Sequence, residues 1–420
     1  MTLFFSTPGF AEEAEKKSSG KKEEAKTIPT AALLKANPAA GQSPADPEKE
    51  VSLTAGWDGS HPYIRSTDGN FLMRFGGSMQ LDYRGYMGAD APTSTFLIRR
   101  ARFQVNGNLY KNFEYIIQAD FADTGSRLLR DAFLNVNYTE KFQVKAGHFK
   151  SPFSQEKLQS SKYLDFVERS SVENLVPGRS PGVMAHGALR DGLIGYEVGA
   201  FNGQGILGNA TDGRPEVFGR LRFTPWKTDA GQFSFGGAVS NGKNGDGESF
   251  LGRPASRSFT FFDRVPVGGE VQRYNAEFWW TYQSFSLRGE YDQSNQFREG
   301  LGGGGGNLPG VISKGFVFQA TYLLTGEKKG LQGIKPLRNF RDGGGLGAWE
   351  VVGRFERLQL DDDVNSNHAT AWTLGVNWWL NKFVRYQANV TFERFHDPLR
   401  APEPGDPDHV AFLSRIQVIF

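Results

Sequence analysis

The chain has 420 residues and a formal net charge of +2, a balance that by itself favours neither an acidic nor a basic partner. It contains no cysteine, which excludes a disulfide framework, a thiolate metal site and a cysteine nucleophile and suits a protein that crosses an oxidising periplasm. No stretch approaches the ~20 continuous apolar residues of a membrane-spanning helix. The mean hydropathy is negative although 13% of the residues are aromatic. Transmembrane barrels have such an average because their strands alternate apolar and polar residues.

The first fifty residues are expected to lie outside the folded domain. Residues 1–11 contain an apolar Leu-Phe-Phe and end in small residues, which resembles the tail of a secretory signal peptide without its basic start. An unstructured N-terminus is the alternative. Residues 12–50 are rich in Lys, Glu, Ala and Pro and have almost no aromatic residues, so we expect a disordered periplasmic leader. The folded domain is expected over residues 51–420.

From Val51 onward, apolar and polar residues alternate with period 2. Met79 and Leu81, for example, share one face of an extended chain over residues 71–84, and Gln80 and Asp82 share the other. The same alternation recurs over 100–109, 113–121, 128–138, 141–149, 182–190, 193–203, 215–225, 231–241, 271–282, 284–296, 315–324, 347–360, 369–380, 382–395 and 410–420. One face suits lipid and the other an aqueous lumen. We therefore predict an all-β fold, an antiparallel transmembrane β-barrel of about sixteen strands.

Connections between these segments alternate in length. The short ones, such as 190–192 and 381–382, carry turn residues. The long ones are the Gly-, Asp- and Pro-rich segments 150–182, 242–270 and 297–314. Short periplasmic turns and long extracellular loops place both termini in the periplasm. Segment 325–346 is long although it falls on the periplasmic side, so either it folds into the barrel mouth or a strand nearby is miscounted.

Residues at the strand ends suggest contacts with the membrane and with assembly factors. The last segment alternates Phe412 and Ile416 with Arg415 and Gln417 and stops on Phe420, an ending that resembles the signal read by the outer-membrane barrel assembly machinery. The pairs Trp279-Trp280 and Trp378-Trp379 lie near strand ends, where we expect them to anchor the barrel at the membrane interface.

The sequence matches several enzymatic motifs only in part, and each match lacks a group that the chemistry requires. Residues 178–182 match G-x-S-x-G, but a nucleophile elbow needs the backbone N–H after the serine, and Pro181 has none. The six histidines show no H-x-x-x-H spacing for zinc, and the glycine run 302–306 lacks the Gly-Lys-Ser/Thr of a phosphate-binding loop. We predict no enzymatic activity, no cofactor and no metal site, and keep a barrel enzyme or an adhesin as the less favoured alternatives.

Strand parity places many basic side chains on the polar face. They are Arg74, Arg84, Arg100, Arg102, Lys145, Arg220, Arg222, Arg273, Arg288, Arg354, Arg385, Arg394 and Arg415. Arginine binds oxyanions through two N–H groups and keeps its charge near neutral pH, and a row of such groups lets an anion step through a pore. Carboxylates on the same face leave open a channel without charge preference. They are Glu114, Asp120, Asp131, Glu277, Glu290, Asp292, Glu350, Glu356 and Glu393.

Six short motifs occur in a fixed order along the predicted strands and loops. They are FLIRRAR at 96–102, LRDAF at 129–133, GHFKSPF at 147–153, VERS at 167–170, YLLTGE at 322–327 and GAWE at 347–350. Together they make residues 55–420 resemble the phosphate-selective porin O and P family. The resemblance implies a sixteen-stranded, usually trimeric barrel in the Gram-negative outer membrane. It also implies a third extracellular loop that folds inward and an arginine ladder that feeds a phosphate-binding constriction.

The resemblance assigns the constriction to the long connection 150–182. In the family, a lysine, a serine pair and an arginine of this loop coordinate phosphate. Carried over residue by residue, these become Lys157, Ser160, Ser161 and Arg169, with Asp131 as the strand carboxylate beside the site and Arg100 facing it from the second strand. We therefore expect a passive channel for anions, with phosphate or polyphosphate as the solute, and a general non-selective porin as the alternative. Expected partners are outer-membrane lipid and lipopolysaccharide, the barrel assembly machinery and two further copies of the chain.

Overall fold

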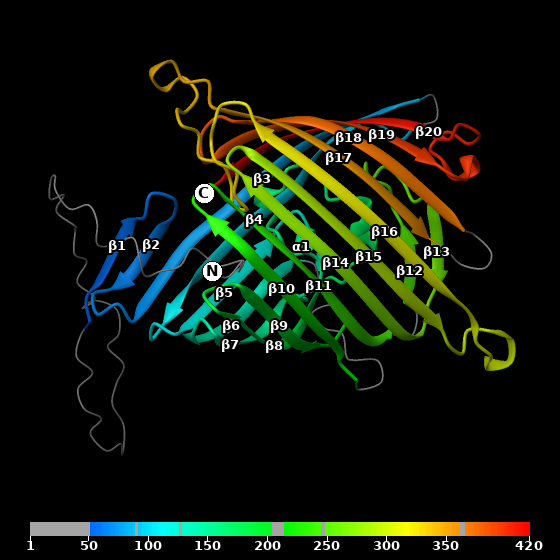
Figure 1. Cartoon of the computed structure of the whole chain (residues 1–420), viewed down its shortest axis with the longest axis horizontal. Helices are drawn as coiled ribbons and strands as arrows, with labels where there is room; N and C mark the ends of the chain where they lie inside the picture. Colours follow the sequence, from blue (N-terminus) through cyan, green and yellow to red (C-terminus); the bar gives the residue numbers. More distant parts are fainter. Residues whose placement is uncertain (1–50, 89–90, 126–127, 204–213, 245–247, 361–365) are drawn as a thin grey trace, which may run out of the picture.

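The computed structural model describes residues 51–88, 91–125, 128–203, 214–244, 248–360 and 366–420. The expected signal-peptide remnant and leader, residues 1–50, lie outside the described residues. The described chain is mainly β-structure (Figure 1). Its helical segments are the short α1 (Gln155–Leu158), η2 (Ser161–Tyr163), η3 (Ser171–Leu175), η4 (Gly303–Gly305), η5 (Asp342–Gly344) and η6 (Pro398–Arg400). Within the described ranges, no helix is long and apolar enough to cross a membrane.

Sixteen antiparallel strands form one closed barrel, which confirms the predicted fold. They are β3 (Phe71–Met87), β4 (Thr95–Leu109), β5 (Phe113–Asp120), β6 (Leu129–Thr139), β7 (Phe142–Lys150), β8 (Arg179–Leu189), β9 (Ile194–Phe201), β10 (Glu216–Thr228), β11 (Gly231–Asn244), β14 (Gly269–Tyr282), β15 (Phe285–Arg298), β16 (Leu308–Leu323), β17 (Ala348–Leu360), β18 (Asn367–Trp379), β19 (Val384–Phe395) and β20 (Asp408–Ile419). Each pairs with the next, and β20 pairs with β3 to close the cylinder. Closure pairs every strand edge, as the bilayer core requires.

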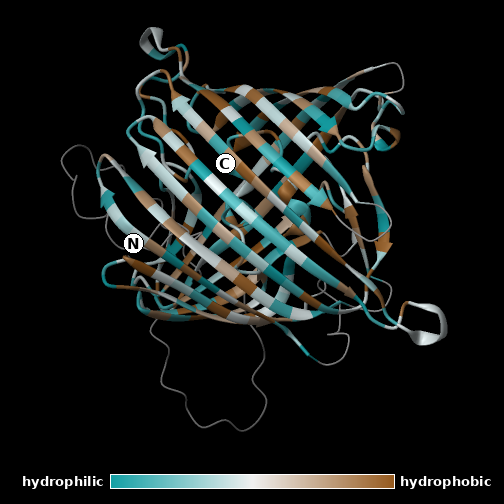
Figure 2. Cartoon of the chain, turned by 45° about the vertical axis from the view of Figure 1, so that its right-hand side comes forward, coloured by the Kyte–Doolittle hydropathy of each residue, from teal (hydrophilic) through white to brown (hydrophobic). Residues whose placement is uncertain are grey.

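Burial along the strands is the reverse of that in a soluble protein. Met79 and Trp372 point outward and are 45% and 56% exposed, whereas Asp82 and Glu350 point inward and are fully buried. Figure 2 shows the resulting alternation of hydrophobic and hydrophilic residues along the strands. Lipid covers the outward apolar side chains, and the polar side chains pack against one another in the lumen.

Only one tryptophan of each expected anchoring pair faces the membrane. Trp280 points outward, as does Trp378, but Trp279 and Trp379 point inward and are 3% exposed. The prediction was wrong for these two because neighbouring residues of a strand lie on opposite faces. Each inward ring instead lies under a lumen arginine, at 5.4 and 4.4 Å from the ring centroid.

The short turns, the first described residues and the C-terminal residue Phe420 lie at one end of the barrel. A hairpin of β1 (Leu53–Trp57) and β2 (Pro62–Ser66) precedes the barrel and pairs with the start of β3, on the left in Figure 1. At the same end, the backbone of Phe420 exchanges hydrogen bonds with that of Gly77. This arrangement matches the predicted topology, in which this end faces the periplasm.

The long connection between β16 and β17 folds into the periplasmic mouth. It lies at the upper left in Figure 1, and its residues Lys329 and Ile334 are only 7% and 4% exposed. The sixteen strands found leave no strand unaccounted for in the described chain. Of the two alternatives left open by the sequence, the first is therefore correct.

The connection between β11 and β14 covers part of the extracellular end. Its described residues 248–268, here called loop L5, contain the small strands β12 (Ser249–Gly252) and β13 (Phe262–Pro266). Phe261 and Phe262 of L5 pack against Leu360 and Phe395 of the barrel wall in one buried apolar cluster. L5 connects β11 to β14 and therefore reaches across the barrel entrance to β17 and β19.

Candidate anion constriction

Residues 151–178, here called loop L3, connect β7 to β8 and pass through the lumen. Main-chain N–H groups of L3 donate to inward-facing side chains on distant strands. These bonds are Gln155 to Glu277 on β14 at 2.8 Å, Val167 to Asn389 on β19 at 2.8 Å and Ser171 to Glu356 on β17 at 2.6 Å. The strands β14 to β19 face β7 and β8 across the barrel. In Figure 1, α1 of L3 lies within the outline of the barrel. The third extracellular loop thus folds inward, as expected.

Three arginines of the predicted ladder bind L3. Arg354 donates to the carbonyl oxygen of Glu168 at 2.8 Å, and Arg385 donates to that of Leu164 at 2.9 Å. Arg288 donates to the side-chain oxygen of Gln159 at 2.5 Å. All three arginines point inward as predicted but are buried, at 3%, 1% and 8% exposure. They satisfy the polar groups of a loop without regular structure, so they are not available to a solute.

The carboxylate of Glu168 fastens L3 to the other edge of this wall. It accepts hydrogen bonds from Arg84 at 2.5 Å and from Arg99 at 2.6 Å. Burial by itself raises the pKa of Glu168, but the charges of Arg99, Arg100 and Arg84 outweigh it and hold this pKa well below the usual range. Glu168 therefore stays ionised, and bound to its arginines, under mildly acidic conditions.

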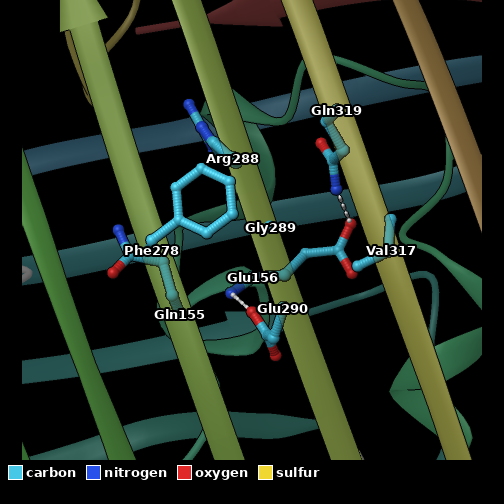
Figure 3. A pocket seen from close by; sticks show the side chains of 8 residues that line it. All are labelled: Gln155, Glu156, Phe278, Arg288, Gly289, Glu290, Val317 and Gln319. Carbon is cyan, nitrogen blue, oxygen red and sulfur yellow. Dashed lines mark hydrogen bonds between the residues drawn. The ribbon is translucent and has the colours of Figure 1, made fainter.

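The start of L3 docks on wall carboxylates around a small cavity. The backbone N–H of Glu156 donates to Glu290 at 3.0 Å, and its carboxylate accepts from Gln319 at 3.0 Å (Figure 3). The cavity, lined also by Gln155 and Arg288, has a volume of only about 10 Å³. That volume is near the minimum for one water molecule, so this pocket does not hold the solute.

The opposite face of L3 meets a group of cations on the wall from β4 to β8. The ammonium of Lys150, at the end of β7, donates to the carbonyl oxygens of Leu158 and Gln159, both at 3.0 Å. The charged groups that interact most strongly with Lys150 are Arg179, Arg169, Asp131 and Arg102. Each of the three arginines has a carboxylate partner: Arg102 pairs with Asp120 at 2.8 Å, Arg179 with Asp131 at 2.9 Å and Arg169 with Glu173 at 3.5 Å. With Lys150 the group contains four cations and three carboxylates, which leaves a small excess of positive charge.

Two β-bulges turn additional arginines toward the lumen. Arg99 is the extra residue where β4 pairs with β3, and Arg130 is the extra residue where β6 pairs with β5. A bulge places two consecutive residues opposite one and turns an outward position inward. Arg130 then pairs with Asp123 and approaches Asp120 to 3.7 Å.

The residues that the family resemblance assigns to the constriction divide into two groups. Lys157 and Arg169 both approach Glu173, at 2.8 and 3.5 Å, and Glu173 also pairs with Arg257 of L5. Burial lowers the pKa of the Lys157 ammonium, and the nearby Glu173 carboxylate partly offsets the effect. This half of the predicted set forms ion pairs that bind L3 to L5.

The second group lies at η2 of L3. The hydroxyl of Ser161 accepts a hydrogen bond from Arg102 at 2.9 Å, and the hydroxyl of Ser160 caps the same turn. The neighbouring Lys162 is half-buried, and its ammonium has no hydrogen-bond or ion-pair partner among the residues that the structure describes. Burial and the charge of Arg102 lower the pKa of Lys162 to about 8.

Asp131 and Arg100 do not face each other as expected. Asp131 accepts two hydrogen bonds from Arg179, at 3.1 and 2.9 Å, while Arg100 donates to Gln80 at 2.7 Å. Arg102, two residues further along β4, is the arginine of this strand that interacts with Asp131. Strand register is the physical reason: Asp131 lies opposite Gln118, and Gln118 lies opposite Gln104, so Arg102 is two residues from the row of Asp131 and Arg100 is four.

The remaining basic residues of the predicted ladder point inward, but several are neutralised. Arg220 pairs with Glu197 and Glu277, Arg273 pairs with Glu216, and Arg74 pairs with Asp58 of the hairpin. Arg222 is 6% exposed, and the Lys145 ammonium lies 4.7 Å from the ring centroid of Phe133. Arg394 was wrongly expected in the lumen: its side chain points outward and is 72% exposed.

A lysine from the periplasmic connection fixes the far end of L3. Lys329 donates to Asp165 of L3 at 2.6 Å and to Glu350 of β17, and all three side chains are buried. Burial raises the pKa of Asp165, but Lys329 and Arg288 outweigh it and keep this pKa below its usual value. L3 is therefore held from the periplasmic side as well as by the wall.

Sequence reasoning missed several charged groups of this region. Arg99, Arg130 and Lys329 have no role in an alternating pattern, since two occupy bulges and one lies in a connection. Lys150 and Arg179 were included in a loop, although they are the last and first residues of strands. One signal was present in the sequence: Arg99, Arg100 and Arg102 cannot all share one face of a regular strand.

A closed antiparallel barrel with a polar lumen and an inward loop is the architecture of channels of the Gram-negative outer membrane. Solved structures with the same fold include a loop-deletion mutant of the outer-membrane protein OmpT of Vibrio cholerae. It has a TM-score of 0.55 and 11% sequence identity, over 84% of this chain and 100% of that one. The anion-selective porin from Comamonas acidovorans has a TM-score of 0.50 and 12% identity, over 83% of this chain and 99% of that one.

The family follows from the sequence comparison. The model of the family described as phosphate-selective porin O and P matches residues 73–420. Porin O of Pseudomonas aeruginosa is 25% identical over 85% of this chain and 90% of its own length. The chain belongs to the phosphate-selective porin O and P family, which confirms the resemblance found in the sequence.

Replacing Lys329 with methionine is expected to loosen L3. The change leaves the buried carboxylates of Asp165 and Glu350 without their shared cation, a situation that costs about 3–5 kcal/mol. We expect a lower unfolding temperature and larger fluctuations of single-channel current in planar bilayers. The exposed neighbour Lys328, replaced in the same way, is the control. Equal noise and equal stability in the two variants would contradict the role given to Lys329.

The charge of Lys162 predicts a pH-dependent current. A lysine is charged below its pKa, so the positive charge at η2 is lost as the pH rises from 7 to 9 through the value of about 8. The anion preference in a potassium chloride gradient, measured as the zero-current potential, should therefore weaken over this range. Lys162→Arg should keep the preference at both pH values. If the arginine variant shows the same decline, other groups cause it.

Proposed function

We propose that this outer-membrane porin is selective for anions and conducts inorganic phosphate or polyphosphate. The supporting observation is the excess of positive charge around Lys150, where L3 meets the wall formed by β4 to β8. An anion that enters this narrow passage loses water, and fixed cations compensate for the lost hydration. Because the charges are held by ion pairs and bulges, they need no rearrangement when the solute arrives.

Phosphate is favoured over chloride by the groups around η2. Arg102 donates to Asp120 through Nε and to Ser161 through Nη1, and its second terminal amino group can bind a phosphate oxygen. The Ser161 hydroxyl accepts from Arg102, so its own hydrogen remains able to donate to an anion oxygen. Lys162 adds a point charge beside the Ser160 hydroxyl. Three donor types at one turn suit a tetrahedral oxyanion better than a spherical halide.

The relatives support the same proposal. The family is described as phosphate-selective, and the structural neighbour from Comamonas acidovorans is described as anion-selective. A general porin without strong preference is the second candidate. It is favoured by the ion pairs of Arg220 and Arg273, which cancel charge elsewhere in the lumen. The cluster at Lys150 lacks that balance, so we place the selective step there.

The chain is also proposed to form a trimer, as a trimer form is described for OmpT of Vibrio cholerae. Small outward side chains on β5 to β9, such as Ala119, Ala132 and Ala200, allow the close approach of another barrel. The terminal Phe420, at the closing seam, is proposed as the contact for the assembly machinery.

Phosphate block of the chloride current tests the solute. We expect millimolar phosphate to reduce the chloride current of the parent protein. Lys162→Gln should raise the blocking concentration about tenfold, because it removes one charge-assisted contact. Lys157→Gln is the matched control, since the Lys157 ammonium is already paired with Glu173; the same change should have a smaller effect there. Chloride current that phosphate does not reduce would favour the general anion porin. Relief of the block only by Lys157→Gln would place the phosphate site at the cations beside Glu173.

A further inference from the structure

Five basic side chains gather on the outer surface of the barrel, away from the solute path. Lys314 of β16, Arg357 of β17, His368 of β18, Arg394 of β19 and His396 after β19 are all exposed or half-exposed. Strand register places Arg357 opposite Thr370 and Thr370 opposite Arg394, while Lys314 and His368 both lie opposite Gln359. The five side chains therefore occupy two adjacent rows on four neighbouring strands, here called the basic patch.

The basic patch lies just beyond the apolar band of the barrel. The next row toward the membrane centre contains outward aromatic residues, Phe318, Phe355, Trp372 and Phe392, paired across the strands. Two of their rings, those of Phe355 and Trp372, are 4.3 Å apart. These rings form an apolar, lipid-facing surface directly below the basic patch.

The spacing of the strands agrees with this depth. Trp378, stacked on Trp349 with a centroid distance of 5.1 Å, belongs to the girdle at the periplasmic end. His368 is ten residues away on β18, about 34 Å along the strand at about 3.4 Å per residue. At a strand tilt of about 40° this corresponds to about 26 Å along the membrane normal, and the apolar band of such barrels is about 25 Å tall. Arg357 and Arg394 lie in the row of Thr370, eight residues from Trp378, which corresponds to about 21 Å along the normal. Their side chains are long enough to reach the headgroups of the outer leaflet, at the level of His368.

Among the described residues, one carboxylate lies within ion-pair distance of the basic patch. Arg394 approaches Asp408 to 3.8 Å, with both side chains largely exposed. Arg357 and Lys314 have no ion-pair or hydrogen-bond partner in the described part of the chain. The rings of His368 and His396 stack with a centroid distance of 4.4 Å.

The opposite wall carries no such group. At the extracellular half of β5 to β9, the outward side chains are apolar, including Ala119, Ala132, Val183 and Val198. The apolar wall of β5 to β9 suits contact with another subunit, whereas the wall that carries the basic patch suits contact with charged lipid. Basic side chains at the depth of the headgroups are attracted to anionic lipid, by about 1 kcal/mol each.

We propose that the basic patch binds the phosphate groups of the anionic glycolipid of the outer leaflet, with Arg357 and Arg394 as the main contacts. Each guanidinium presents parallel N–H groups to phosphate oxygens, and Lys314 supplies a flexible third cation. The acyl chains of the same lipid would lie over the aromatic rings below. The site is independent of the lumen, so it goes beyond the proposed transport of anions.

Lipid titration of the purified barrel in detergent tests this site. Bisphosphorylated lipid A and its dephosphorylated form are the two probes, and native mass spectrometry counts the bound lipid. Arg357→Gln combined with Arg394→Gln should weaken binding of the phosphorylated form about 30-fold, equivalent to about 1 kcal/mol for each arginine. The same two-charge change at Lys243 and Arg264, on other extracellular parts of the chain, is the matched control and should leave the affinity unchanged.

Folding of each variant is verified by an unchanged single-channel conductance, which the outward position of both arginines predicts. Equal binding of lipid A by the variant and the parent would overturn the proposal. Equal affinity for the phosphorylated and dephosphorylated lipid would also overturn it, because phosphate would then not be what is recognised. Loss of trimers in the variant would assign the basic patch to a contact between copies instead.

Discussion

The architecture of this porin depends on the charged hydrogen bonds that hold L3 against one half of the lumen. L3 has little regular structure, and its main-chain polar groups need partners wherever they are buried. Inward-facing arginines, carboxylates and amides of β14 to β20 provide them, as in the bonds from Arg354 and Arg385. The loop occupies that half, and we infer that ions pass beside β4 to β8, where the cations around Lys150 lie.

Three separate elements hold this arrangement together. The wall binds L3 from the side, Lys329 binds its tip from the periplasmic end, and Arg257 of L5 binds Glu173 from the extracellular end. Removal of one partner from a buried ion pair costs more than the pair contributes, because the other charge remains buried. The network therefore specifies a single position of the loop, and the charge pattern of the constriction follows from that position.

The sequence predicted the strands well because period-2 alternation is a local property, and a membrane barrel displays it on every strand. It could not predict that Arg354 and Arg385 bind carbonyl oxygens of L3 whereas Arg102 binds Asp120 and the Ser161 hydroxyl, since the alternation is the same for all three. The bulges at Arg99 and Arg130 and the bond from Lys329 to Asp165 depend on contacts between residues far apart in the chain. Arg394 was misplaced for a simpler reason: it is an odd number of residues from Arg385 and so lies on the opposite face.

The most direct test of this account is the accessibility of single cysteines, which the cysteine-free chain makes possible. Arg130→Cys and Arg354→Cys can be treated with a charged methanethiosulfonate reagent while the current is recorded in a planar bilayer. The account predicts that modification of the cysteine at position 130 reduces the current quickly, while the cysteine at position 354, covered by L3, does not react. Rapid modification at position 354 with none at position 130 would contradict the claim that ions pass beside β4 to β8.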